Sequence, residues 1–90
     1  SRFPVGTRVT EERVGRIGRI ETHLRTIGVS QFRARWHTLD GGEMVRIEVA
    51  DSDIVVVAQS GIRESIVDVC RAEGFTWVTL DLQSYGTPRA

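Results

Sequence analysis

The chain has 90 residues, of which 40% are apolar and 27% are charged, and its formal net charge at pH 7 is zero. A chain of this length supports one domain with a modest core, and this apolar fraction argues against intrinsic disorder. The lack of an overall positive charge argues against a protein that binds nucleic acid non-specifically.

Arginine supplies all twelve basic residues of the chain, and lysine is absent. Residues 1–35 carry eight arginines and three acidic residues, whereas residues 36–90 carry four arginines and nine acidic residues. This uneven distribution predicts either self-association or an anionic ligand on the basic half. Arginine forks onto carboxylates and phosphates, which favours an anionic ligand, although a coding bias toward arginine gives the same usage.

The single cysteine, Cys70, excludes a disulfide or a thiolate metal site built within the chain. No apolar run approaches the roughly 18 residues of a membrane span, and the first residues do not form a signal peptide. We therefore expect a cytoplasmic protein with no membrane partner. Because the chain begins at Ser1 and not at methionine, we also expect it to be one domain of a larger protein.

A helix is predicted from residue 11 to residue 27, with Thr10 as its N-cap and Gly28 as its stop. Gly15 and Gly18 lie inside this helix at a cost of about 1 kcal/mol each, which predicts a close approach of another backbone there. One face of the helix carries apolar residues at three- and four-residue spacing, namely Val14, Ile17, Ile20, Leu24 and Ile27.

Two strands are predicted over residues 31–37 and 44–49, and the short glycine-containing turn between them predicts an antiparallel hairpin. Residues 50–60 fit either a short helix or an extended segment. Alternation along the two strands places Phe32, Ala34, Trp36, Val45, Ile47 and Val49 on one face and Gln31, Arg33, Arg35, His37, Met44, Arg46 and Glu48 on the other.

A second helix is predicted over residues 61–73, capped by Ser60 and ended by Gly74, and a last strand over residues 75–82. The resulting order is α-β-β-α-β. It predicts an α+β fold in which two helices cover one face of a three-stranded, mainly antiparallel sheet. The uncovered face would then carry Arg33, Arg35, Arg46, Glu48 and Asp81, and the aromatic residues Phe75 and Trp77 share the phase of Asp81.

Arg33 and Arg35 are the candidate functional residues of this uncovered face, because two strand steps place their side chains roughly 7 Å apart. Their repulsion is about 0.6 kcal/mol in water and about 2.4 kcal/mol near a partly buried surface. The pair therefore either remains in solvent, with cross-strand ion pairs, or grips a phosphate or carboxylate together with Arg46. His23 and His37 are too isolated to predict a metal site, and Cys70 lies on an apolar helix face as a structural residue.

Three stretches resemble motifs of the LarE-type ATP-dependent sacrificial sulfur transferases, in the PP-loop ATP pyrophosphatase superfamily. Residues 1–12, SRFPVGTRVTEE, are similar to the family pattern S-R-x-P-x-G-T-x-x-T-E-E. Residues 32–37, FRARWH, are similar to F-R-V-R-H-H and continue as RIEV at 46–49. Residues 74–82, GFTWVTLDL, are similar to G-F-x-x-V-T-L-D-L. The chain departs from the family at Trp36, where a histidine is usual, and in a longer hairpin.

The resemblance implies that residues 1–90 form a single C-terminal domain of a larger PP-loop enzyme, without the ATP-binding N-terminal domain. Members of the family adenylate a carboxylate of a pyridinium biscarboxylate mononucleotide and transfer sulfur to it, which matures the nickel-pincer nucleotide. The sulfur source, a cysteine upstream of the Ser-Arg pair or an iron–sulfur cluster, stays open. ATP and Mg²⁺ would bind mainly to the other domain, and the isolated chain would need no cofactor and would be inactive.

By the same resemblance, Ser1, Arg2, Arg33 and Arg35 would line the substrate site, and Glu21, Arg46 and Glu48 would lie close behind them. No catalytic residue and no metal ligand is assigned within the chain. The implied partners are the PP-loop domain, an anionic nucleotide substrate and further copies of the chain, and oligomer contacts are expected. The alternative is a stand-alone module that binds an anion, RNA or a protein. To read RNA, such a sheet would need aromatic residues on its uncovered face for base stacking.

Overall fold

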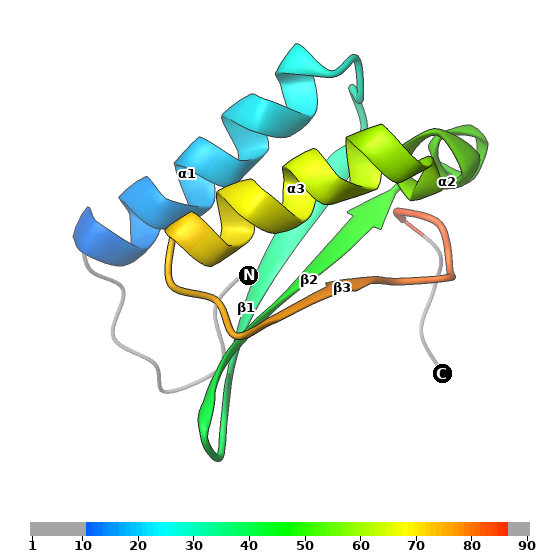
Figure 1. Ribbon diagram of the computed structural model, residues 1–90. Helices are drawn as coiled ribbons and strands as arrows, with labels where there is room; N and C mark the ends of the chain where they lie inside the picture. The colour runs from blue at the N-terminus through cyan, green and yellow to red at the C-terminus, as the bar shows by residue number, and fades with distance from the viewer. Residues whose placement is uncertain (1–10, 87–90) are drawn as a thin grey trace.

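The computed structural model describes residues 11–86, which form three helices and a three-stranded sheet (Figure 1). The predicted α+β fold is confirmed, and the segment left open in the sequence forms an additional helix. No helix in the described range is long and apolar enough to cross a membrane. The elements in chain order are α1 (Glu11–Thr26), β1 (Phe32–Leu39), β2 (Gly42–Val49), α2 (Asp51–Ala58), α3 (Ser60–Ala72) and β3 (Trp77–Leu80).

Both predicted glycine stops end their helices in the same way. After α1, the N–H of Gly28 donates to the carbonyl of Arg25 and the N–H of Val29 donates to that of Leu24, each at 3.0 Å. After α3, Gly74 and the residue that follows it make the equivalent bonds. Both glycines have a φ of 95°, in the left-handed region that residues with a Cβ rarely adopt. The glycines therefore fix where each helix ends and where the chain turns next.

The sheet has the order β1-β2-β3, so β2 is central and β3 is an outer strand. β1 and β2 form the predicted antiparallel hairpin, but its strands extend further than expected and leave only Asp40 and Gly41 in the turn. β3 is shorter than the predicted 75–82 and runs parallel to β2, because α2 and α3 carry the chain back to the end of the sheet at which β2 began. Most of the cross-strand pairs are antiparallel, as expected.

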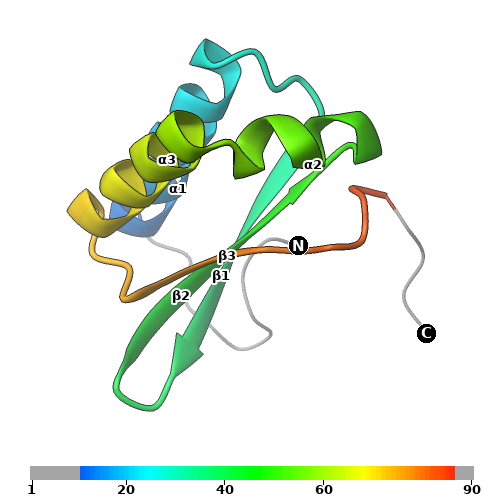
Figure 2. The ribbon, with the colours of Figure 1, turned by 45° about the vertical axis from the view of Figure 1, so that its right-hand side comes forward.

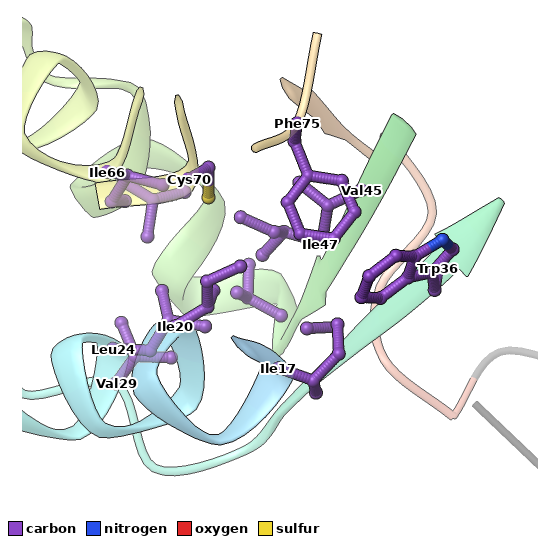
Figure 3. Packing of buried hydrophobic residues seen from close by; sticks show 13 residues of the cluster. Ile17, Ile20, Leu24, Val29, Trp36, Val45, Ile47, Ile66, Cys70 and Phe75 are labelled. Atoms are coloured by element: carbon purple, nitrogen blue, oxygen red, sulfur yellow. The ribbon is translucent and has the colours of Figure 1, made fainter. Parts of the chain in front are cut away.

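The helices lie on one side of the sheet, and the core fills the space between the two layers (Figures 1 and 2). The apolar stripe of α1 is confirmed at its centre, whereas Val14 is 50% exposed. Figure 3 shows the central packing, where the ring of Phe75 meets that of Trp36 edge-on at 4.7 Å between centroids. The buried apolar residues are Ile17, Ile20, Leu24, Val29, Ala34, Trp36, Val45, Ile47, Val49, Val57, Ile66, Cys70 and Phe75.

One prediction about side-chain placement is wrong. Phe75 was expected on the uncovered face, but it precedes β3 and turns into the core, where it is 2% exposed. The described residues also provide no close approach of another backbone to Gly15 or Gly18. Among residues 11–86, a Cβ at Gly18 would meet nothing within 4 Å, and a Cβ at Gly15 would meet only the side chain of Arg19. Packing within this part of the chain therefore does not require either glycine of α1.

Candidate anion-binding face

The sheet face opposite the helices carries the polar residues of the strands. Ala34, Val45 and Ile47 are buried against the helices, so the residues that alternate with them project from the other side. We call this surface the arginine face. Its charged residues are Arg33, Arg35, Arg46, Glu48 and Asp81.

Glu48 is the organising residue of the arginine face. Its side chain is only 3% exposed, and its Oε2 accepts a hydrogen bond from Arg35 Nε at 2.7 Å and another from Arg46 Nη2 at 3.1 Å. Arg46 Nε lies 3.6 Å from a carboxylate oxygen of Asp81, at the end of β3. Arg35 and Arg46 are direct cross-strand neighbours, so their like charges would repel each other without Glu48 between them. The buried carboxylate therefore fixes two guanidiniums side by side.

Arg33 has a different environment from Arg35. In the register it lies directly opposite Glu48, yet its guanidinium lies over the ring of Tyr85, 5.3 Å from the centroid. Tyr85 is held in place by its backbone N–H, which donates to the carbonyl of Val49 at 2.7 Å. Among the residues that the structure describes, Arg33 makes no hydrogen bond or ion pair. Its planar guanidinium, braced by an aromatic ring, can fork onto an anion.

His37 lies on the same face, beyond Arg35 along β1, and lies opposite Met44 in the hairpin. Burial lowers the pKa of His37 below its usual value of 6.5, and the nearby charges of Arg46 and Arg35 lower it further. The imidazole is therefore neutral at pH 7 and adds no charge to the face. Within the part of the chain that the structure describes, three arginines and two acidic residues give the arginine face a formal charge of +1.

The structure brings together four of the predicted site residues, Arg33, Arg35, Arg46 and Glu48, on one surface. Ser1 and Arg2 lie outside the described residues. Glu21 is buried on α1, which packs on the helix side of the sheet. The sequence analysis did not assign Tyr85 to the site. The signal that could have indicated Tyr85 is its position shortly after the third motif, residues 74–82.

A second group of arginines, which was not predicted, lies on the helix side. The guanidiniums of Arg13 and Arg16 lie 4.6 and 4.3 Å from the ring centre of Trp36. The indole N–H of Trp36 donates to Glu43 Oε2 at 2.6 Å, and both arginines lie within 4 Å of that carboxylate. This arrangement gives Trp36, which departs from the family motif, a structural role in joining α1 to the hairpin.

The described residues of the arginine face carry guanidiniums suited to an anion, and none of them is a cysteine or a metal ligand. Among residues 11–86, no three histidine, cysteine, aspartate or glutamate side chains come together as a metal site. Cys70 is fully buried in the core, and burial, with a smaller effect of Glu73, raises the pKa of its thiol to about 12. A thiol with this pKa is not a thiolate near neutral pH, so Cys70 is a structural residue.

Comparison with known proteins relates almost the whole chain to one part of two longer proteins. It is 36% identical over 85 residues to an uncharacterized protein of Synechocystis sp., which covers 94% of this chain. It is 30% identical over 91 residues to the pyridinium-3,5-bisthiocarboxylic acid mononucleotide synthase of Lactiplantibacillus plantarum, which covers 99% of this chain. The chain spans 30% of the length of each relative. No family model matches the chain.

Proposed function

We propose that the chain is the substrate-binding part of an ATP-using, PP-loop sulfur transferase that acts on a pyridinium biscarboxylate mononucleotide. Two findings support this proposal. The chain is similar over 99% of its length to a synthase whose name describes a pyridinium mononucleotide with two thiocarboxylates. The resemblance described above covers the same stretch and assigns Arg33 and Arg35 to the substrate site.

The observation that carries the proposal is the shared carboxylate of Glu48. Because Arg35 and Arg46 both bind it, their guanidiniums are already in place before an anion arrives, and no like-charge repulsion has to be overcome at that moment. Arg33 stands beside them over Tyr85. In the proposed complex Arg33 forks onto the phosphate or a carboxylate of the nucleotide, and Arg35 and Arg46 supply the surrounding positive field.

The reacting groups of the proposed enzyme belong to the rest of the protein. The described residues contain no glycine-rich phosphate loop and no acidic cluster for Mg²⁺, so ATP and Mg²⁺ would bind to the PP-loop domain. This chain would hold the nucleotide with its carboxylate toward that domain. The isolated chain would bind the substrate without turning it over, and contacts between copies would complete the assembly.

The proposal is tested with nicotinic acid mononucleotide, which carries a pyridinium ring, one carboxylate and one phosphate. An isotope-labelled NMR titration of the chain should shift the backbone amides of β1 and β2 around Arg33 and Arg35 in a saturable way. Arg33→Ala should weaken this binding by about tenfold or more, because it removes a charge-assisted fork. Arg71→Ala, at an exposed arginine in the last turn of α3, is the matched control and should bind as the unaltered chain does.

Two further ligands separate the contributions of the nucleotide. Pyridine-3,5-dicarboxylate lacks the phosphate, and nicotinamide mononucleotide lacks the carboxylate, so each should bind more weakly than the probe. Equal affinity of Arg33→Ala and Arg71→Ala for nicotinic acid mononucleotide would remove the arginine face from the proposal. An equal response to a phosphate-containing single-stranded RNA would favour a nucleic-acid module instead.

A further inference from the structure

A pocket opens on the side of the sheet opposite the arginine face. Its volume is about 250 Å³, and it lies between the outer strand β3 and the helices α2 and α3. We call it the β3 pocket. It is lined by Ile47, Val57, Ala58, Arg63, Ile66, Val67, Val78, Thr79 and Leu80.

The β3 pocket is apolar except for one charged residue. The hydroxyl of Thr79 is engaged, since it donates to the carbonyl of Val45 at 3.1 Å. Arg63, in the first turns of α3, is exposed and makes no hydrogen bond or ion pair through its side chain with the residues that the structure describes. An arginine that has no acidic partner among the described residues and stands beside an apolar pocket suits a ligand that joins an apolar body to an anionic group.

The pocket is separate from the site of the proposed function. Ile47 follows Arg46 in β2, and Val78 lies in the neighbouring strand β3. Both point toward the helices, whereas Arg46 points to the arginine face. The sheet therefore lies between the two sites. A ligand in the β3 pocket would touch none of the residues assigned to the nucleotide.

We infer that the β3 pocket binds a small aliphatic carboxylate, with its hydrocarbon chain in the pocket and its carboxylate on Arg63. A volume of 250 Å³ holds about eight groups the size of a water molecule, which suits a chain of about six to eight carbons. The pocket is smaller than the roughly 300–1,000 Å³ of sites for larger ligands. Among the described lining residues, the only other polar side chain is that of Thr79, whose hydroxyl is engaged by the Val45 carbonyl, so the lining suits neither a sugar nor a nucleotide. Arg63 repels an amine.

The test is an NMR titration of the 90-residue chain with octanoate, octanol and octylamine. These three ligands share one hydrocarbon chain and differ only in the polar group. Octanoate should shift the amides of Ile66, Val67 and Val78 in a saturable way at concentrations up to about 10 mM. Octanol should bind about tenfold more weakly, because it lacks the charge that pairs with Arg63, and octylamine should give no saturable shift at these residues.

Two variants tie the binding to the pocket. Arg63→Ala should weaken octanoate binding to the level of octanol and leave octanol binding unchanged, while Arg71→Ala on the same helix should alter neither. Ala58→Leu places a larger side chain in the lining and should weaken octanoate and octanol together. Circular dichroism of each variant checks that the chain is folded.

Several results would overturn the inference. One is the absence of any saturable shift at the pocket residues with octanoate, and another is equal binding of octanoate and octanol. Octanoate shifts confined to the neighbourhood of Arg33 and Arg35 would assign the carboxylate to the arginine face and not to the pocket. Pocket shifts that appear on concentrating the protein alone, together with a rise in mass by light scattering, would assign the pocket to a second copy of the chain. Because the probes differ, failure here leaves the nucleotide titration unaffected.

Discussion

Arg35 has Arg46 as its direct cross-strand neighbour, and its Nε donates a hydrogen bond to Glu48 Oε2 at 2.7 Å. The same oxygen accepts from Arg46 at 3.1 Å, so a single buried carboxylate oxygen holds both guanidiniums. The two arginines remain partly exposed, at 26% and 32% of their side chains, whereas Glu48 is almost fully covered. The negative charge is therefore beneath the surface and the positive charges are at it, which is the arrangement that attracts an anion from solvent.

Replacing Glu48 by glutamine should lower the free energy of unfolding by about 2 kcal/mol. The amide keeps the size of the side chain but removes the charge that both Arg35 and Arg46 bind, so that their mutual repulsion is less compensated. Urea denaturation measures the change. Glu64→Gln, at an exposed position on α3, is the control and should change stability by less than about 0.5 kcal/mol. Equal stabilities of the two variants would mean that Glu48 does not organise the face.

Arg33 and Arg35 should separate binding from stability. Arg33→Ala should leave the free energy of unfolding within about 0.5 kcal/mol of the unaltered chain, because its side chain makes one cation–ring contact with Tyr85. Arg35→Ala should lower it by about 1–2 kcal/mol, because Glu48 loses its shorter hydrogen bond. Urea denaturation and the nucleotide titration on the same samples give both quantities. A loss of stability in Arg33→Ala as large as that in Arg35→Ala would contradict this separation.

Local signals in the sequence predicted the parts of the fold that depend on near neighbours. Gly28 and Gly74 marked the ends of two helices, since a left-handed residue is needed there whatever the rest of the chain does. The alternation of Phe32 to Trp36 likewise identified a strand and its two faces. Alternation along the two strands also predicts that Arg33, Arg35, Arg46 and Glu48 share one surface.

The parts that were not predicted depend on contacts between distant residues. Ile54 to Ala58 is a short apolar run, which periodicity cannot assign to a helix or a strand, and in the structure it is helical and packs against α3. Phe75 has the phase of a strand residue, but it belongs to the turn after Gly74 and points into the core. The contact of Arg33 with Tyr85 joins residues 52 positions apart. The sequence therefore predicts which face of the strand carries Arg33, but it does not predict that Tyr85 lies beside it.

Two glycines with equally open surroundings should respond to alanine in opposite directions. Among the described residues, a Cβ at Gly18 or at Gly28 would meet nothing within 4 Å, but Gly18 is helical and Gly28 has a φ of 95°. Gly18→Ala should raise the free energy of unfolding by about 0.5–1 kcal/mol, because alanine restricts the unfolded chain and suits a helix. Gly28→Ala should lower it by about 1 kcal/mol or more, because L residues are strained at that φ.

Thermal or urea unfolding of both variants checks this expectation, and the opposite signs make each variant the control of the other. A destabilising Gly18→Ala would show that an unseen neighbour approaches α1 at this position. Such a neighbour would leave no room for a Cβ at position 18 and would explain the glycine, which the described residues do not.

Cys70 should resist thiol reagents as long as the chain is folded. Its thiol is fully buried, and burial, followed by the charge of Glu73, raises its pKa from 9.0 to about 12. At pH 8 this difference lowers the thiolate fraction by about a thousandfold relative to an unshifted thiol, and only the thiolate reacts. A dithionitrobenzoate assay on folded protein should therefore be slower than in guanidinium by at least about a hundredfold.

The raised pKa of Cys70 also makes the free energy of unfolding depend on pH. The folded chain favours the protonated thiol more than the unfolded chain does, so this contribution is fully present below pH 9 and is lost as the pH rises toward 12. Cys70→Ala should lower the free energy of unfolding at pH 7 because it leaves a small cavity, and it should flatten the fall in stability above pH 9. Rapid modification of the folded chain at pH 8 would place an accessible thiolate in the core and would contradict the assignment of Cys70 as a structural residue.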